Sequence, residues 1–146
     1  MVWKYVLAWF PMVPIAILNG AIRQAAILPL VGELPAHQIS CFTGIILLGL
    51  FMYWVVRKWT PVSMRQAVGL GILWVAMTIV FEFIFGHYIM GHSWEKLFHD
   101  YDLSAGRLWI IVLLWTAAAP ALLRWLAGSA RTADSTRTPD STRTPG

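Results

Sequence analysis

Three histidines and several carboxylates fall within one short part of the sequence, residues 82–102. Glu82 lies inside an apolar run, and His87, His92 and His99 follow it. Imidazole and carboxylate groups are common ligands of divalent metals and common acids and bases in catalysis. This segment is therefore the first place to look for a metal site or a catalytic site.

The spacing of these side chains does not favour a single metal ion. His92, Glu95 and His99 share one helix face, but the two histidines are separated by roughly 10 Å along the axis. The HExxH motif is absent, and His87 lies about 140° around a helix from Glu82. We therefore expect no metal, no cofactor and no catalytic residues, and we interpret the histidines as side chains at a membrane surface.

The composition indicates that membrane helices position these residues. Of the 146 residues, 58% are hydrophobic and 12% are charged, whereas a soluble domain averages about 25% charged residues. The single cysteine, Cys41, excludes an intrachain disulfide and a multi-cysteine zinc site. The net charge is +4, but the basic residues form no patch, so nucleic acid is not an expected partner. The expected partner is the lipid bilayer.

Four apolar segments are long enough to cross the hydrocarbon as helices, at about 5–28, 36–56, 67–88 and 106–126. They predict an all-α polytopic membrane protein with one four-helix bundle over residues 1–127. An apolar stripe between the third and fourth spans predicts a short interfacial amphipathic helix at about 93–101. Residues 128–146, which repeat DSTRTP twice, are expected to be a disordered polar tail.

Basic residues indicate the orientation of the bundle. Arg57, Lys58 and Arg65 lie in one connection, without an acidic residue, and the positive-inside rule places that connection in the cytoplasm. With four spans, both termini are then cytoplasmic, and the connections at 29–36 and 89–105 lie outside. The expected location is the bacterial cytoplasmic (inner) membrane, with multiple passes.

The ionisable residues inside the spans all fall toward the outer side. Arg23 lies roughly 8 Å and Glu82 roughly 9 Å from the outer ends of their helices. Because a lone charge in hydrocarbon is costly, we predict an Arg23–Glu82 ion pair. Asn19 lies one turn from Arg23 and could join it, and His37 and Gln38 could cap the cluster from the second span.

This polar cluster has two interpretations. A buried ion pair can simply fix helix register and partner choice. The same residues can instead form a pocket for an ion or a small polar molecule. The expected rim of such a pocket comprises His87, His92, Glu95, His99, Asp100, Asp102 and Arg107.

Three stretches carry a family resemblance: LNGAIRQ, AHQIS and FEFIFGHYIMGHSWEKLFHDYDLSAGRLW. Together they resemble a group of small bacterial four-helix membrane proteins, over about residues 19–109. The resemblance implies the fold and carries no activity. GAIR also resembles the glycine–arginine motif of the small fluoride channels, but the phenylalanine–serine–threonine motif of that family is absent.

Three classes of function follow, in order of preference. The first is an accessory or assembly protein that the Arg23–Glu82 pair organises. The second is a small oligomeric transporter or channel for an ion or small polar molecule. The third is a membrane enzyme that acts on a lipid or an extracytoplasmic substrate. A second copy of the chain or another membrane protein is an open alternative for a partner.

Overall fold

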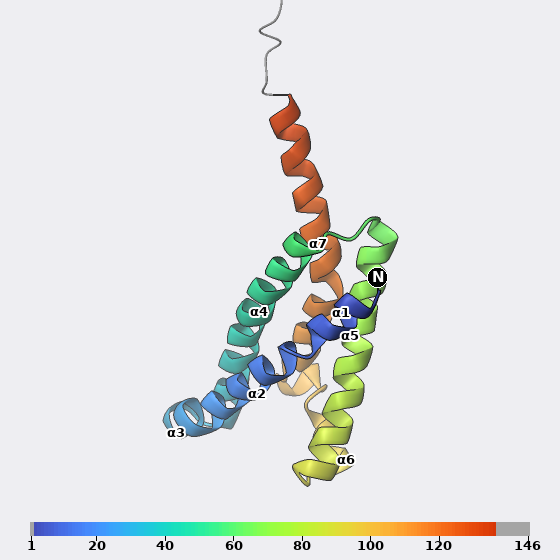
Figure 1. The fold of residues 1–146 in the computed structure, drawn as a ribbon. Coiled ribbons are helices and arrows are strands. Elements are labelled where there is room, and N and C mark those ends of the chain that lie inside the picture. Colours follow the sequence, from blue (N-terminus) through green and yellow to red (C-terminus); the bar gives the residue numbers. More distant parts are fainter. Residues whose placement is uncertain (1, 137–146) are drawn as a thin grey trace, which may run out of the picture.

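The computed structural model describes residues 2–136, which form helices and no strands. Four helical stretches in this range are long and apolar enough to cross a membrane: Val2–Val31, Glu33–Lys58, Met64–Ile89 and Trp109–Ser135. The chain is therefore an all-α, multi-pass membrane protein, which confirms the predicted fold class (Figure 1).

The first span is the least regular of the four. Helix α1 (Val2–Trp9) ends just before Pro11, which lacks the N–H that a continuous helix needs. Helix α2 (Met12–Ile22) follows, then a π-helical turn η1 (Arg23–Ile27) and the short α3 (Leu28–Val31). Figure 1 shows this span crossing the other three obliquely.

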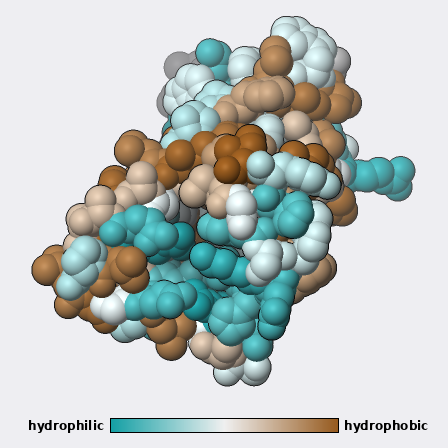
Figure 2. Space-filling view, turned by 90° about the horizontal axis from the view of Figure 1, so that it is seen from below, coloured by the Kyte–Doolittle hydropathy of each residue, from teal (hydrophilic) through white to brown (hydrophobic). Residues whose placement is uncertain are grey.

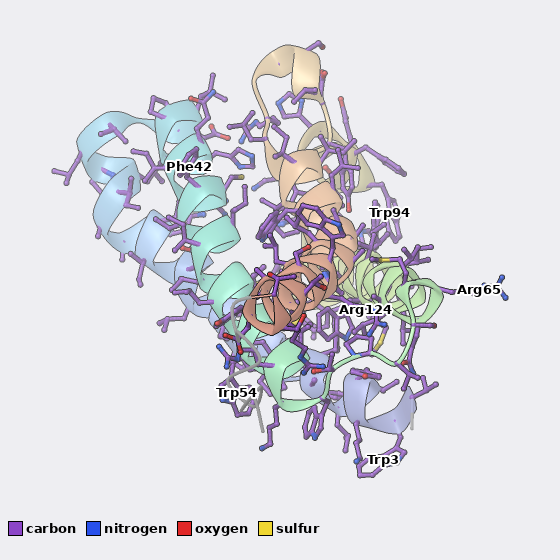
Figure 3. All side chains as sticks on the ribbon, turned by 90° about the horizontal axis from the view of Figure 1, so that it is seen from above. Trp3, Phe42, Trp54, Arg65, Trp94 and Arg124 are labelled. Atoms are coloured by element: carbon purple, nitrogen blue, oxygen red, sulfur yellow. The ribbon has the colours of Figure 1, made fainter. Side chains whose placement is uncertain are left out.

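The remaining spans form the centre of the bundle. They are α4 (Glu33–Lys58), α5 (Met64–Ile84) and α7 (Trp109–Ser135). Helix α7 packs on both α4 and α5 and lies between them, as Figure 3 shows. Gly71 allows close approach, because a Cβ atom there would lie 2.0 Å from the carbonyl oxygen of Ala117.

Buried and exposed side chains divide in the way a bilayer requires. Met52, Val55 and Trp74 are fully buried, and the Trp74 indole donates a hydrogen bond to the backbone oxygen of Tyr5 at 2.9 Å. Large apolar residues such as Phe42 point outward and stay 68% exposed. Apolar side chains that surround a helix on all faces are typical of a membrane span.

The connection between the third and fourth spans closes one end of the bundle. The third span ends in a π-helical turn η2 (Phe85–Ile89), and the connection after it contains helix α6 (Trp94–His99) and a 3₁₀ turn η3 (Leu103–Ala105). The predicted short helix is present, and Ser93 caps it by accepting a hydrogen bond from the Lys96 N–H. Leu97 is buried against Gly86, where a Cβ atom would lie 2.6 Å from the Leu97 Cδ2 atom. We call this the α6 end, and the end with the turn at 59–63 the opposite end.

Helix α7 differs at both ends from the segment that the sequence predicts for the fourth span. Helix α7 begins at Trp109 rather than 106, because Asp102 caps η3 and Gly106 then turns the chain with a φ of 80°. It continues to Ser135, so residues 128–135 are helical rather than disordered. The Ser129 and Thr132 hydroxyls fit within the helix by donating to carbonyls one turn back. The rest of the predicted tail, 137–146, lies outside the described residues.

Candidate functional site

A cavity of about 260 Å³ lies among the helices at the α6 end. Its deeper wall is apolar and includes Ile15, Leu48, Phe81 and Val112. Its wall nearer the α6 end is polar and includes Asn19, Arg23, His37, Glu82, His92 and Asp100. Figure 2, which views this end directly, shows hydrophilic side chains gathered over it and apolar side chains around them.

Arg23 is the cation of this cavity. It begins the π-helical turn η1 and is half-buried. Its guanidinium forms no salt bridge and donates no hydrogen bond to any residue in the described range. The cavity therefore has an arginine that no described side chain neutralises.

The predicted Arg23–Glu82 ion pair is wrong. Glu82 lines the same cavity, but its Oε2 atom accepts hydrogen bonds from the Tyr101 hydroxyl at 2.6 Å and from the Trp109 Nε1–H at 2.8 Å. Tyr101 follows α6 and Trp109 begins α7, so both donors come from the part of the chain where the fourth span starts. Two neutral donors replace the cation that the sequence suggested.

Asn19 also has a role other than the predicted one. Its Nδ2 group donates to the Ser40 backbone oxygen at 2.7 Å, and its Oδ1 atom accepts from the Thr43 hydroxyl at 2.6 Å. These bonds join the first span to α4 and do not involve Arg23. Gly44 lies next to this contact, since a Cβ atom there would be 3.3 Å from Asn19 Nδ2.

The two residues expected from the start of α4 separate in the structure. His37 is buried, lines the cavity and lies 3.5 Å from the Cys41 sulfur through its Nε2 atom. Gln38 is not part of the lining, and its Nε2 group donates to the Gly106 backbone oxygen at 3.1 Å. Gln38 therefore ties α4 to the turn before α7.

Arg107 closes the α6 end with two salt bridges. It pairs with Glu33 at 2.7 Å and with Asp100 at 3.6 Å. Glu33 begins α4, so the pair connects the turn after the first span to the segment before the fourth. Asp100 reaches the cavity wall from the end of α6.

The expected rim residues fall into two groups. His92 and Asp100 line the cavity, whereas His87 does not line it and stacks on Trp94 with ring centroids 3.8 Å apart. The His87 Nδ1 atom also lies 2.9 Å from the His92 backbone oxygen. Glu95, His99 and Asp102 are exposed and do not line the cavity.

Asp102 is a helix cap. The Ser104 hydroxyl and the backbone N–H groups of Ser104 and Ala105 hydrogen-bond to its carboxylate. The Ser104 hydroxyl bond, foremost, holds the pKa of Asp102 below its usual value. This bonding accounts for the carboxylate without any role as an acid or base.

The sequence did not identify the groups that hold Glu82. These groups are Tyr101, which follows α6, and Trp109, which begins α7. Both can donate one hydrogen bond, which buried tyrosines and tryptophans usually do. A tyrosine and a tryptophan near a span that contains an unpaired carboxylate were therefore the available signal for these hydrogen bonds.

Both π-helical turns lie beside the charged residues of the cavity. Turn η1 begins at Arg23, and η2 begins three residues after Glu82. Single π-turns inside α-helices occur frequently at functional sites, because they re-aim side chains at a local cost in hydrogen bonding. This coincidence on two different spans supports a ligand site rather than a simple structural contact.

No group of three or more histidine, cysteine, aspartate or glutamate side chains within the described chain could hold a metal ion. The ligand role of the rim stays a prediction. Comparison with protein families, with curated proteins and with solved structures finds no match to the chain.

Proposed function

We propose that the protein binds the phosphate-bearing head group of a membrane lipid in the cavity at the α6 end. The observation that carries this proposal is Arg23, a guanidinium without a partner among the described residues, in a cavity whose deeper wall is apolar. An uncompensated charge in a span costs about 2.5–3.5 kcal/mol even on the mildest scale. An anion bound to Arg23 would remove that cost and gain bidentate hydrogen bonds.

The dimensions of the cavity favour a lipid over a small soluble molecule. Leu48, at the deep end, lies roughly 22 Å along α4 from Glu33, so the cavity runs from the polar end toward the middle of the bilayer. A volume of about 260 Å³ holds a head group and the start of a chain rather than a whole lipid. Ile17 and Met90 line the cavity and are about half exposed, which supports an opening toward the surrounding lipid.

The charge distribution supports an outward-facing site in a bacterial cytoplasmic membrane. Arg57, Lys58, Arg65 and Arg124 all lie at the opposite end of the bundle. The positive-inside rule then places that end in the cytoplasm and the α6 end outside. The lipid would come from the outer leaflet.

The other classes of function have weaker support. An assembly role rested on the Arg23–Glu82 pair, which does not form. Passage through the bundle is disfavoured because buried Met52, Val55 and Trp74 fill its core between the cavity and the opposite end. These positions favour binding at one end of the molecule.

Substitution of Arg23 tests the proposal. Protein purified in a mild detergent is analysed by native mass spectrometry for bound phospholipid. We expect Arg23→Gln to lower occupancy about tenfold or more, because a charge-assisted hydrogen bond contributes about 1.5–3 kcal/mol. Arg23→Lys keeps the charge but loses the bidentate geometry, so its occupancy should be intermediate.

Arg65→Gln is the matched control. Arg65 is exposed at the opposite end and projects away from the bundle (Figure 3). Its substitution removes the same charge and should leave bound lipid unchanged. If Arg23→Gln folds, as judged by size-exclusion chromatography and circular dichroism, and retains lipid like the wild type, the proposed function is wrong. The proposed function is also wrong if the wild-type protein carries no phospholipid.

A further inference from the structure

The Glu82 carboxylate offers a second binding group to the cavity. Its two hydrogen bonds from Tyr101 and Trp109 both end on Oε2. Its other oxygen, Oε1, accepts no hydrogen bond from the described residues, yet it is not enclosed by protein. Since Glu82 lines the cavity, this oxygen is available to a ligand.

Aromatic side chains line the cavity together with this carboxylate. Phe81 and Phe85 stack with ring centroids 5.1 Å apart, and both line the cavity together with Trp109. The faces of aromatic rings attract cations, and a carboxylate beside them adds a full negative charge. The surroundings of Glu82 therefore suit an organic cation.

The free Oε1 atom distinguishes two kinds of organic cation. A primary ammonium has three N–H donors and can satisfy a carboxylate oxygen directly. A quaternary ammonium has none, so it would leave Oε1 without a hydrogen bond in a poorly hydrated site. Glu82 therefore favours a primary ammonium.

The cavity thus has a cationic and an anionic group on separate walls. Arg23 belongs to the first span and Glu82 to the third, and no salt bridge joins them. We infer that the bound head group is a phosphoethanolamine zwitterion, an inference that rests on the proposed lipid function. Arg23 binds its phosphate, and Glu82 Oε1 accepts a hydrogen bond from its ammonium.

Competition between lipids tests this inference. The protein is exchanged into detergent with equal amounts of phosphatidylethanolamine, phosphatidylglycerol and phosphatidylcholine of the same acyl chains, and bound lipid is measured by native mass spectrometry. We expect the wild type to prefer the ethanolamine lipid over each of the other two by about tenfold, since one charge-assisted hydrogen bond is at stake. Glu82→Gln should reduce that preference to about one while still binding lipid through Arg23.

Glu95→Gln is the control for the loss of a carboxylate at the same end. Glu95 lies on α6, is exposed and does not line the cavity, so its substitution should leave the preference unchanged. Equal binding of the three lipids by the wild type overturns the inference, and this result does not depend on any variant folding. A tenfold preference that Glu82→Gln retains also overturns it. Failure to bind any of the lipids would instead refute the proposed function.

Discussion

Neutral donors hold Glu82 in a way that keeps its charge available. The Tyr101 hydroxyl and the Trp109 indole both donate to one oxygen, and such bonds stabilise a carboxylate without cancelling it. Because Arg23 takes no part in this contact, the charges of Arg23 and Glu82 both stay on the cavity wall. The arrangement has a measurable consequence for the partner of Glu82 that lies outside the spans, Tyr101.

The first prediction at this scale concerns the ionisation of Tyr101. Burial, and then the hydrogen bond and charge of Glu82, raise the pKa of Tyr101 above the ordinary value of 10.0. A folded-state pKa above the unfolded value means that this stabilising contribution is complete below about pH 10. It is lost as the pH rises further toward the folded-state pKa. We expect the Tyr101 phenol to stay protonated through pH 10.

The absorbance of tyrosinate near 295 nm measures this ionisation. The difference between wild type and Tyr101→Phe isolates the contribution of Tyr101. In Glu82→Gln the ionisation should shift to lower pH, because the neighbouring negative charge that opposes it is gone. Ionisation of Tyr101 at its ordinary pH in the folded wild type would contradict the hydrogen bond to Glu82.

At the scale of the elements, α5 and α7 depend on one close backbone contact. Small residues allow helices in a membrane to approach closely, where packing replaces the hydrophobic effect as the driving force. Helix α5 carries two such residues near its start, Gly69 and Gly71. In the structure Gly71 meets the Ala117 backbone, while a Cβ atom at Gly69 would meet nothing within 4 Å.

These two glycines give a matched pair of substitutions. Gly71→Ala should lower the free energy of unfolding by about 1–3 kcal/mol, since the backbone of Ala117 must move to admit the methyl group. Gly69→Ala, in the same helix, should be neutral or stabilising by up to about 1 kcal/mol through helix propensity. Unfolding in mixed micelles of increasing dodecyl sulfate content measures both. Equal effects of the two substitutions would argue against the α5–α7 contact.

At the scale of the whole molecule, the two ends differ in charge and in shape. The opposite end carries the basic residues on which the predicted orientation rests, and the α6 end carries the cavity and the Arg107 salt bridges. The first span packs obliquely against α4 (Figure 1), and the cavity lies at the α6 end. The proposed use of an outer-leaflet lipid therefore depends on orientation.

Cysteine labelling tests the orientation directly. In a Cys41→Ala background, Ser104→Cys marks the α6 end and Val62→Cys marks the opposite end, and both positions are exposed. A membrane-impermeant maleimide should label position 104 in intact spheroplasts and position 62 only after lysis. The reverse pattern would place the cavity on the cytoplasmic side and exclude an outer-leaflet ligand.

The sequence by itself determined the class of the fold. Runs of apolar residues long enough for the hydrocarbon predicted four helices, because backbone groups in a bilayer must bond within their own segment. The apolar stripe between the third and fourth spans also predicted the short helix α6. These features are local in the chain, so periodicity is sufficient to find them.

Only the tertiary structure decided which polar groups meet. The depth of Arg23 and Glu82 along their helices follows from the sequence, and both residues line one cavity as their similar depth suggests. Depth does not give the direction in which each side chain points. The π-helical turns and the oblique first span change that direction, and neither has a clear signal in the sequence. The partners of Glu82 are therefore Tyr101 and Trp109, because the segments that carry them pack beside Glu82 and bring their donors to hydrogen-bond distance.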